Sequence, residues 1–220
     1  MTNSGKKIRV VLVDDHEIVR SGLRALLQTH PGIEVVGEAS EGRRAVELVK
    51  DSLPDVLVMD VRMPGLNGID ASRQALAVKP DLKIVALSAN CDERSTSAML
   101  RAGAVGYVSK EAAYEELVAA IQSVVKGVVY LSPAIVSTLV HSVKNEGEPV
   151  PETSFGRLSM REREILQLIA EGKATKEIAL ILRVSIKTAE THRRNIMEKL
   201  NLDNVAELTK YAIREGLTGV

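Results

Sequence analysis

The chain of 220 residues is poor in cysteine and in aromatic residues. It contains one cysteine (Cys91), one phenylalanine, four tyrosines and no tryptophan. A single cysteine excludes an internal disulfide and is typical of a protein in a reducing compartment. Because aromatic side chains are so scarce, aliphatic side chains must fill the core, and a hydrophobic content of 45% is sufficient for this.

Long apolar runs are also missing. No hydrophobic stretch approaches the roughly 20 residues that are needed to span a bilayer. The polar segment at residues 1–7 is not followed by the apolar region of a signal peptide. We therefore expect no membrane partner and a cytoplasmic location.

The net charge of the chain is zero, so the whole molecule is neither strongly basic nor strongly acidic. Charge is nevertheless uneven along the sequence, because residues 183–199 contain five basic and two acidic side chains. A short basic helix is a better indication of nucleic-acid binding than the charge of a whole chain.

The first half of the sequence alternates short apolar runs with segments of helical periodicity. The apolar runs are Ile8–Val13, Ile33–Val36, Val56–Met59, Ile84–Leu87 and Val105–Val108. Near-continuous apolar strands that alternate with helices are typical of a parallel sheet covered on both faces. Five such units fit into about 125 residues, which predicts an α/β flavodoxin-like (βα)5 domain.

The last 65 residues of the sequence carry helical signals only, and a linker precedes them. A short helix over residues 132–143 precedes a polar segment at residues 144–156, which contains prolines and glycines and has the character of an interdomain linker. Ser159 and Glu162 then form the pattern of a capping box. Three further residues are suited to begin helices: Thr175, Ser185 and Asn204. A short turn between two of these helices indicates an all-α four-helix helix-turn-helix domain.

Polar side chains stand at the ends of the predicted strands. Asp14 and Asp15 follow the first strand, Asp60 the third, Ser88 the fourth and Lys110 the fifth. The carboxyl ends of parallel strands meet at one edge of the sheet, so these side chains are expected to converge. Clustered carboxylates need a cation, and Mg²⁺ prefers oxygen ligands. A carboxylate can also attack a phosphoryl donor, while a metal and a lysine offset the charge of the phosphoryl oxygens.

Each of these residues has a simpler interpretation when it is taken alone. The Asp14–Asp15 pair can cap the helix that follows, and Asp60 can open a turn. The others can be an ordinary strand-end serine, a surface lysine and a packed aromatic residue, namely Ser88, Lys110 and Tyr107. Their joint placement at successive strand ends favours one common site.

Around these residues the sequence resembles the receiver domain of two-component response regulators, over about residues 7–126. The matching motifs are Val-Leu-Val-Asp14-Asp15-His, Val-Met-Asp60-Val-Arg-Met-Pro-Gly, Ala-Leu-Ser88-Ala and Gly-Tyr107-Val-Ser-Lys110. The resemblance implies that Asp60 accepts the phosphoryl group. It also implies that Mg²⁺ is held directly by Asp15, Asp60 and the backbone carbonyl of Arg62, with help from Asp14.

The same resemblance implies a switch. The Ser88 hydroxyl would bond to the phosphoryl group, Lys110 would pair with it, and Tyr107 would rotate inward. The site would then bias a two-state element that includes the last two strands of the predicted (βα)5 sheet. The side chain of Arg62 lies next to the site in sequence and can alter the lifetime of the phosphoryl group.

The predicted helix over residues 186–200 has one polar face. Five of its residues fall within an arc of about 100°: Lys187, Glu190, Thr191, Arg194 and Glu198. Ala189, Ile196 and Leu200 lie opposite and would pack inward. A helix of this kind suits the major groove of DNA, where arginine bonds to guanine and glutamate accepts from cytosine. The simpler alternative is the solvated face of a helical bundle. For His192, a backbone contact or a packed position is favoured over a metal ligand, because no cysteine or second histidine lies nearby.

This region resembles the LuxR-type output domain of NarL/FixJ response regulators, from about Leu158 to Gly216. The strongest motif is Ser185-Ile-Lys187-Thr188-Ala-Glu190-Thr-His192-Arg-Arg-Asn195-Ile. The expected DNA contacts are Lys187, Thr188, Glu190, Thr191, His192, Arg194, Asn195 and Lys199. Arg183 stands where many relatives have glycine, which would cause strain if the backbone there is left-handed.

Together these interpretations predict a receiver domain at residues 1–128, a helical segment and linker at 129–156, and a LuxR-type domain at 157–220. A sensor histidine kinase would phosphorylate Asp60, and the chain would then form a homodimer, bind promoter DNA and act on RNA polymerase. Two alternatives remain open. The receiver can be a dimerisation module that is never phosphorylated, or the chain can be a phosphatase. A phosphatase of this kind usually has an acid where this chain has Arg62, so we expect no enzyme.

Overall fold

The computed structural model describes residues 6–89, 92–111, 114–145 and 154–218. Cys91 and most of the predicted linker lie outside the described residues. The chain forms two compact units, an α/β unit that ends with Asn145 and a helical unit that follows it. The predicted limits at residues 128 and 156 stay predictions. Within the described residues, no helix is both long and apolar enough to cross a bilayer.

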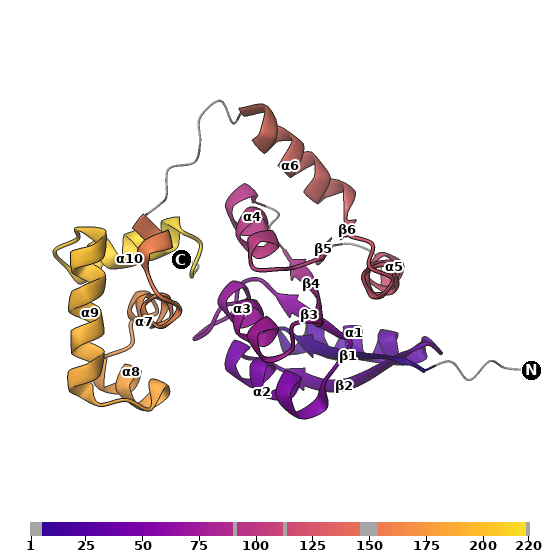
Figure 1. Cartoon of the computed structure of the whole chain (residues 1–220), viewed down its shortest axis with the longest axis horizontal. Coiled ribbons are helices and arrows are strands. Elements are labelled where there is room, and N and C mark those ends of the chain that lie inside the picture. The colour runs from indigo at the N-terminus through magenta and orange to yellow at the C-terminus, as the bar shows by residue number, and fades with distance from the viewer. Residues whose placement is uncertain (1–5, 90–91, 112–113, 146–153, 219–220) are drawn as a thin grey trace, which may run out of the picture. The chain divides into compact units, whose positions relative to one another are not determined.

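The α/β unit contains a parallel sheet, as predicted (Figure 1). Its strands are β1 (Ile8–Val13), β2 (Ile33–Ala39), β3 (Val56–Asp60), β4 (Lys83–Ser88), β5 (Gly106–Ser109) and β6 (Tyr130–Leu131). They lie in the order β2-β1-β3-β4-β5-β6. The strand order reverses between β1 and β3, and this is the point at which open α/β sheets bind ligands. The two-residue strand β6 is an addition to the five predicted strands.

Helices cover both faces of this sheet. They are α1 (Glu17–Thr29), α2 (Gly42–Ser52), α3 (Gly68–Val78), α4 (Glu93–Arg101), α5 (Tyr114–Val125) and α6 (Pro133–Asn145). Alternate strand residues such as Val10, Leu12 and Val58 share one core with Leu27 of α1 and Ile121 of α5. Their neighbours along the strands point to the other face, where α2, α3 and α4 pack in succession. The apolar strands are therefore buried on both sides.

The helical segment after α5 belongs to the same unit. β6 pairs with β5, and α6 packs against α4 and β5 with Ile135 fully buried. The predicted helix over residues 132–143 is confirmed as α6. Its first residues continue the α/β core, because the short strand β6 returns the chain to the edge of the sheet.

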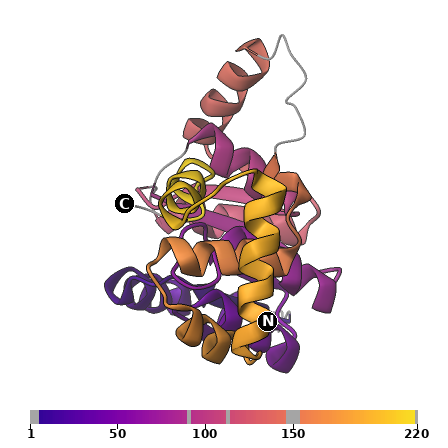
Figure 2. The same ribbon diagram turned by 90° about the vertical axis from the view of Figure 1, so that its left-hand side faces the viewer.

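In its described part, residues 154–218, the helical unit has a 3₁₀ turn, η1 (Ser154–Arg157), and four helices: α7 (Met160–Ala170), α8 (Thr175–Leu182), α9 (Ile186–Leu200) and α10 (Val205–Arg214). Figure 2 shows α9 lengthwise, with α8 near its first turn. Aliphatic side chains from all four helices form one core, which includes Ile165, Ile178, Ile196 and Leu208. The prediction of an all-α helix-turn-helix domain is confirmed.

Helix starts in this unit are mostly those that the sequence indicates. The capping box of Ser159 and Glu162 is formed, and Ser185 and Asn204 cap α9 and α10 with their side chains. The expectation for Thr175 is wrong. The cap of α8 is Ala174, whose backbone N–H is bound by the Glu177 carboxylate at 2.7 Å. Glu177 satisfies the helix start from inside the first turn, so no capping hydroxyl is needed.

Candidate functional site

The carboxyl edge of the sheet gathers the polar residues that follow the strands. Asp14 comes directly after β1, Asp60 and Ser88 are the last residues of β3 and β4, and Lys110 follows β5. The backbone N–H of Lys110 donates to the Ser88 carbonyl at 2.8 Å, which ties the ends of β4 and β5 together. Because the strands run parallel, residues that are far apart in the sequence lie close together at this edge.

Two buried carboxylates share one ammonium group. The Nζ of Lys110 lies 2.6 Å from Oδ2 of Asp60 and 2.7 Å from Oδ2 of Asp14. Asp14 and Asp60 are 2% and 3% exposed. Charges this deeply buried are stable only when they are paired, so Lys110 is the local counter-ion of the site.

The titration of the site follows from burial and pairing. Burial raises the pKa of the Asp60 carboxyl to about 6, and the negative charge of Asp14 adds to this rise, although the Lys110 ammonium opposes it. Burial would lower the pKa of Lys110, but its hydrogen bonds to Asp14 and Asp60 outweigh that effect and raise it. The positive charge of Lys110 thus offsets only part of the effect of burial on Asp60. The raised pKa gives this carboxylate the basicity of a group that can act as a nucleophile near neutral pH.

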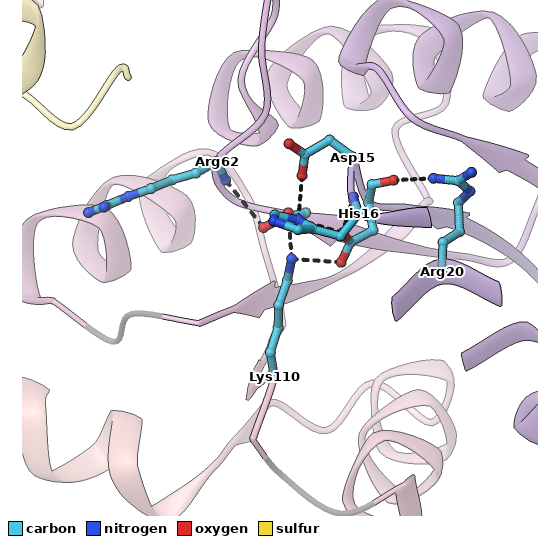
Figure 3. Close-up of polar contacts among 7 residues, drawn as sticks. Asp15, His16, Arg20, Arg62 and Lys110 are labelled. Carbon is cyan, nitrogen blue, oxygen red and sulfur yellow. Dashed lines mark hydrogen bonds and ion pairs between the residues drawn. The ribbon is translucent and has the colours of Figure 1, made fainter. Parts of the chain in front are cut away.

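Two residues that the sequence analysis missed contact the Asp14–Asp15 corner (Figure 3). The Nδ1 of His16 lies 2.9 Å from Oδ1 of Asp15 and 3.3 Å from Oδ1 of Asp14. The guanidinium of Arg20 donates to the backbone carbonyl of Asp14 at 2.7 Å. His16 directly follows the aspartate pair and Arg20 lies in the first turn of α1, so adjacency to the motif was the only available signal.

The loop after Asp60 passes very close to the site. The backbone N–H of Gly68 donates to the Val61 carbonyl at 3.0 Å. A Cβ atom at Gly68 would lie 1.9 Å from the Asp60 carbonyl oxygen, so no side chain fits there. The Arg62 N–H donates to Oδ1 of Asp60 at 3.3 Å. The loop therefore contacts Asp60 twice, at its backbone carbonyl through Gly68 and at its carboxylate through the Arg62 N–H.

The Arg62 side chain points away from the carboxylates in Figure 3. Its guanidinium forms an ion pair of 2.8 Å with Asp92, the residue that also caps α4. In this structure the arginine contacts the start of α4 and leaves the charge balance of the pocket to Lys110.

The two predicted switch residues are buried. Ser88 is 2% exposed at the end of β4, and Tyr107 is fully buried in β5. The role of these two residues as a switch stays a prediction.

The donor set at this edge fits a hard divalent cation. Asp14, Asp15, His16 and Asp60 each offer one ligand atom, and these atoms all lie within 4.8 Å of one another. Carboxylate oxygens are the ligands that Mg²⁺ prefers. The structure thus brings together three of the predicted metal ligands, while the part played by the Arg62 carbonyl stays a prediction.

The polar face of α9 is accessible in the helical unit. Lys187, Glu190 and Arg194 are exposed, while Ala189 and Ile196 are buried in the core. Two of the other predicted contacts are engaged within the helix. The Thr188 hydroxyl bonds with the capping hydroxyl of Ser185, and the Thr191 hydroxyl donates to the Lys187 carbonyl at 2.9 Å.

Of the remaining predicted DNA contacts, two are less accessible, whereas Lys199 is exposed but paired. His192 and Asn195 are half-buried, and the Nδ1 of His192 is buried without a hydrogen-bond partner among the described residues. The Nζ of Lys199 contacts both carboxylate oxygens of Glu162 at 2.8 and 2.7 Å. The sequence analysis missed this pair because the two residues lie on different helices, 37 positions apart.

Both resemblances found in the sequence are confirmed by comparison with known proteins. Residues 10–122 match the response regulator receiver domain, and residues 157–212 match the bacterial regulatory proteins of the luxR family. The oxygen regulatory protein NreC of Staphylococcus carnosus is 41% identical over 214 residues, which cover 96% of this chain and 99% of NreC. Response regulator UvrY of Escherichia coli is 41% identical over 210 residues, with 96% and 95% of the two chains covered.

Solved structures agree with this. One that contains two RcsB dimers bound to two parallel DNAs has a TM-score of 0.59 and 28% identity, and the match covers 94% of this chain and 98% of the RcsB chain. The chain therefore belongs to the NarL/FixJ family of two-component response regulators, in which a receiver domain is joined to a LuxR-type DNA-binding domain.

Proposed function

We propose that this regulator is switched by phosphorylation of Asp60 by a sensor histidine kinase, and that it then dimerises and binds promoter DNA through α9. The observation that carries the proposal is the contact of Lys110 with Asp60 and Asp14 at the carboxyl edge of the sheet. A nucleophilic carboxylate, a fixed cation and a set of metal ligands are the parts that phosphoryl transfer to aspartate requires.

In the transfer step a carboxylate oxygen of Asp60 bonds to phosphorus, and the bond from phosphorus to the donor nitrogen of the kinase histidine breaks. The electron pair of that bond stays on the histidine nitrogen. A bound Mg²⁺ would supply positive charge to the phosphoryl oxygens. Lys110 already lies at Oδ2 of Asp60, so its ammonium needs little movement to contact the incoming group. Asp14, Asp15, Asp60 and the Arg62 carbonyl would hold the metal.

The output follows from the change of charge at this edge. A phosphoryl group adds negative charge beside Lys110 and the Ser88 hydroxyl, so the ends of β4 and β5 are drawn to it. Tyr107 is fully buried in β5, two residues before the end of that strand. The state in which the phosphoryl group binds the Ser88 hydroxyl and Tyr107 stays buried would favour a receiver surface that dimerises.

DNA binding is assigned to α9 and its flanks. The proposed contacts are Lys187, Thr188, Glu190, Thr191, His192, Arg194, Asn195 and Lys199. Exposure of Lys187, Glu190 and Arg194, and the DNA-bound dimers of the relative RcsB, support this assignment. RNA polymerase is the expected partner of the DNA-bound regulator. A cytoplasmic location is expected because the proposed target is promoter DNA. No enzymatic turnover of a separate substrate is proposed.

The test is phosphorylation by a small phosphodonor with Mg²⁺, followed by oligomer mass and affinity for promoter DNA. We expect one phosphoryl group per chain, an increase in mass to the dimer and tighter DNA binding. Asp60→Asn should abolish all three, and the exposed Asp81→Asn should retain them. Labelling that persists in Asp60→Asn refutes the site. Dimerisation and DNA binding that do not respond to the donor favour a receiver that acts only as a dimerisation module. Release of phosphate from added monoesters favours a phosphatase.

A separate variant tests the helix. Arg194→Ala is expected to weaken promoter binding by about 1–3 kcal/mol and to relax the preference at one base pair. An affinity and a base preference that both stay unchanged would place the DNA contacts elsewhere in the helical unit.

A further inference from the structure

We propose that the imidazole of His16 is an additional ligand of the metal site and gives this receiver a preference for a divalent first-row transition ion over Mg²⁺. The inference rests on the proposed function in one respect, because it takes the acidic edge of the sheet to be a metal site. It concerns the selectivity of that site, which the carboxylates alone do not determine.

The position of the imidazole nitrogen carries the proposal. His16 Nδ1 lies 2.9 Å from Oδ1 of Asp15 and 3.3 Å from Oδ1 of Asp14. It belongs to a set of four donor atoms, completed by Asp60, that all lie within 4.8 Å of one another. Figure 3 shows the ring beside the carboxylates, between Asp15 and Lys110.

These separations suit six-coordinate geometry. With metal–ligand distances of about 2.1 Å, neighbouring ligand atoms lie about 3 Å apart and opposite atoms about 4.2 Å apart. The Nδ1–Oδ1 distances of 2.9 and 3.3 Å correspond to neighbouring ligands. An ion held by His16, Asp15 and Asp14 would take the place of the ion pair between the His16 ring and Asp15.

The Asp14 carboxylate is divided between two partners. Lys110 contacts its Oδ2 atom at 2.7 Å, whereas His16 lies next to its Oδ1 atom. An ion on the Oδ1 side leaves the Lys110 contact in place, so the lysine stays available for a phosphoryl group. The His16 side chain is 67% exposed and attached to a free helix start without a side-chain cap, so small adjustments of the ring meet no packing barrier.

The selectivity follows from the chemistry of the donors. Carboxylate oxygens suit Mg²⁺, but a neutral imidazole nitrogen strongly favours ions such as Fe²⁺, Co²⁺ and Ni²⁺. Mg²⁺ gains little from replacing a water by imidazole. His16 should therefore raise the affinity for a transition ion and leave that for Mg²⁺ nearly unchanged.

Calorimetric titration of the full chain with Co²⁺ alone and with Mg²⁺ alone separates these effects. We expect wild-type protein to bind Co²⁺ more tightly than Mg²⁺. His16→Ala should lose about tenfold or more in Co²⁺ affinity and less than twofold in Mg²⁺ affinity. His16→Asn, which keeps a polar group but lacks the imidazole, should behave in the same way. His141→Ala, which removes a histidine of α6, is the matched control and should leave both affinities unchanged.

A direct readout comes from protein labelled with ¹³C-histidine. Co²⁺ should shift the signals of one of the four imidazoles strongly, and His16→Ala should remove those signals. Equal losses of Co²⁺ and Mg²⁺ affinity in His16→Ala overturn the proposal, because they show that His16 only orients Asp15. Unchanged affinities, or strongly shifted signals that persist in His16→Ala, also overturn it.

The labelling experiment distinguishes failure of this inference from failure of the proposed function. If His16→Ala shows unchanged metal preference while Asp60 is still phosphorylated with Mg²⁺, only the role of His16 is wrong. If neither ion binds and Asp60 takes no phosphoryl group, both proposals are wrong.

Discussion

At the scale of single residues, Asp60 shows how the pocket is prepared for chemistry at the expense of stability. Its carboxylate is buried, and Lys110 compensates only part of the loss of hydration. The pKa of Asp60 is therefore about 6, well above the ordinary value of 3.8. A group with this shift destabilises the folded metal-free protein when it is ionised.

Asp60→Asn is expected to stabilise the metal-free α/β unit at pH 7.5 by at most about 3 kcal/mol, because one pKa unit corresponds to about 1.4 kcal/mol. The folded state binds this proton more tightly than the unfolded chain. The contribution of Asp60 is therefore fully present below about pH 4 and is lost as the pH rises through about 6. Urea unfolding at pH 7.5 and 5 measures the difference, which should shrink at the lower pH. An advantage of the same size at both pH values contradicts this account.

Arg183 carries a different kind of strain, in its backbone. It ends α8 in the left-handed conformation with φ 53°, where a side chain is unfavourable and glycine is not. The strain that the sequence analysis made conditional on this conformation is therefore present.

Arg183→Gly is expected to stabilise the helical unit by up to about 1 kcal/mol, since glycine relieves the left-handed strain. Arg183→Ala is the control, because it removes the same side chain but keeps a Cβ atom. Thermal unfolding of the helical unit should show a gain for glycine alone. Equal midpoints for both variants would mean that the backbone there is not strained.

At the scale of elements, the start of α7 and the end of α9 are joined through one carboxylate. Glu162 accepts from the Ser159 N–H within the capping box and from the ammonium of Lys199. Burial would raise the pKa of Glu162, but the hydrogen bonds from Lys199 and Ser159 outweigh burial and lower it. The ionised glutamate thus satisfies a helix start and fixes α9 in place at once.

Lys199→Met is expected to reduce the unfolding free energy of the helical unit by about 1–2 kcal/mol, since a hydrogen bond to a charged group is lost while the carboxylate stays buried. Because the pKa of Glu162 is lowered, this contribution is present above the ordinary pKa and disappears as the pH falls through the lowered value. Chemical unfolding at pH 7 and at pH 3 measures it, with the exposed Lys173→Met as control. A loss as large at pH 3 as at pH 7 would argue against the ion pair.

At the scale of the whole molecule, the proposed DNA binding depends on the distribution of charge along the chain and hardly on the net charge. The net charge is zero, yet residues 183–199 are locally basic, and α9 exposes Lys187 and Arg194 on one face. Under the proposed function, attraction to DNA would therefore come from one short segment in each chain. A dimer presents two such segments, so phosphorylation would increase affinity through the number of contacts.

The salt dependence of promoter affinity measures whether one or two chains of the dimer contact the DNA. Each phosphate contact contributes about 0.9 to the slope of log affinity against log salt. Lys187→Ala should reduce the slope for the phosphorylated protein on a two-half-site promoter by about 2, one contact from each chain. The slope should fall by about 1 on a single half-site. A reduction of about 1 on both DNAs would mean that only one chain contacts the promoter.

The parallel α/β fold, the helix-turn-helix unit and the residues at the carboxyl edge of the sheet could all be predicted from the amino-acid pattern. This was possible because an apolar strand pattern dictates topology, and in a parallel sheet topology alone brings Asp14, Asp60 and Lys110 together. Local capping patterns such as that of Ser159 can also be predicted, because they depend only on neighbours along the chain.

The partners of several individual side chains became known only from the folded chain. The ring of His16 lies on the carboxylates, Arg62 pairs with Asp92 away from them, and Lys199 binds Glu162 from another helix. The edge strand β6 likewise forms because β5 is already in place to pair with it. Periodicity predicts which face of a helix a side chain lies on, but neither periodicity nor motif spacing encodes which partner that side chain contacts.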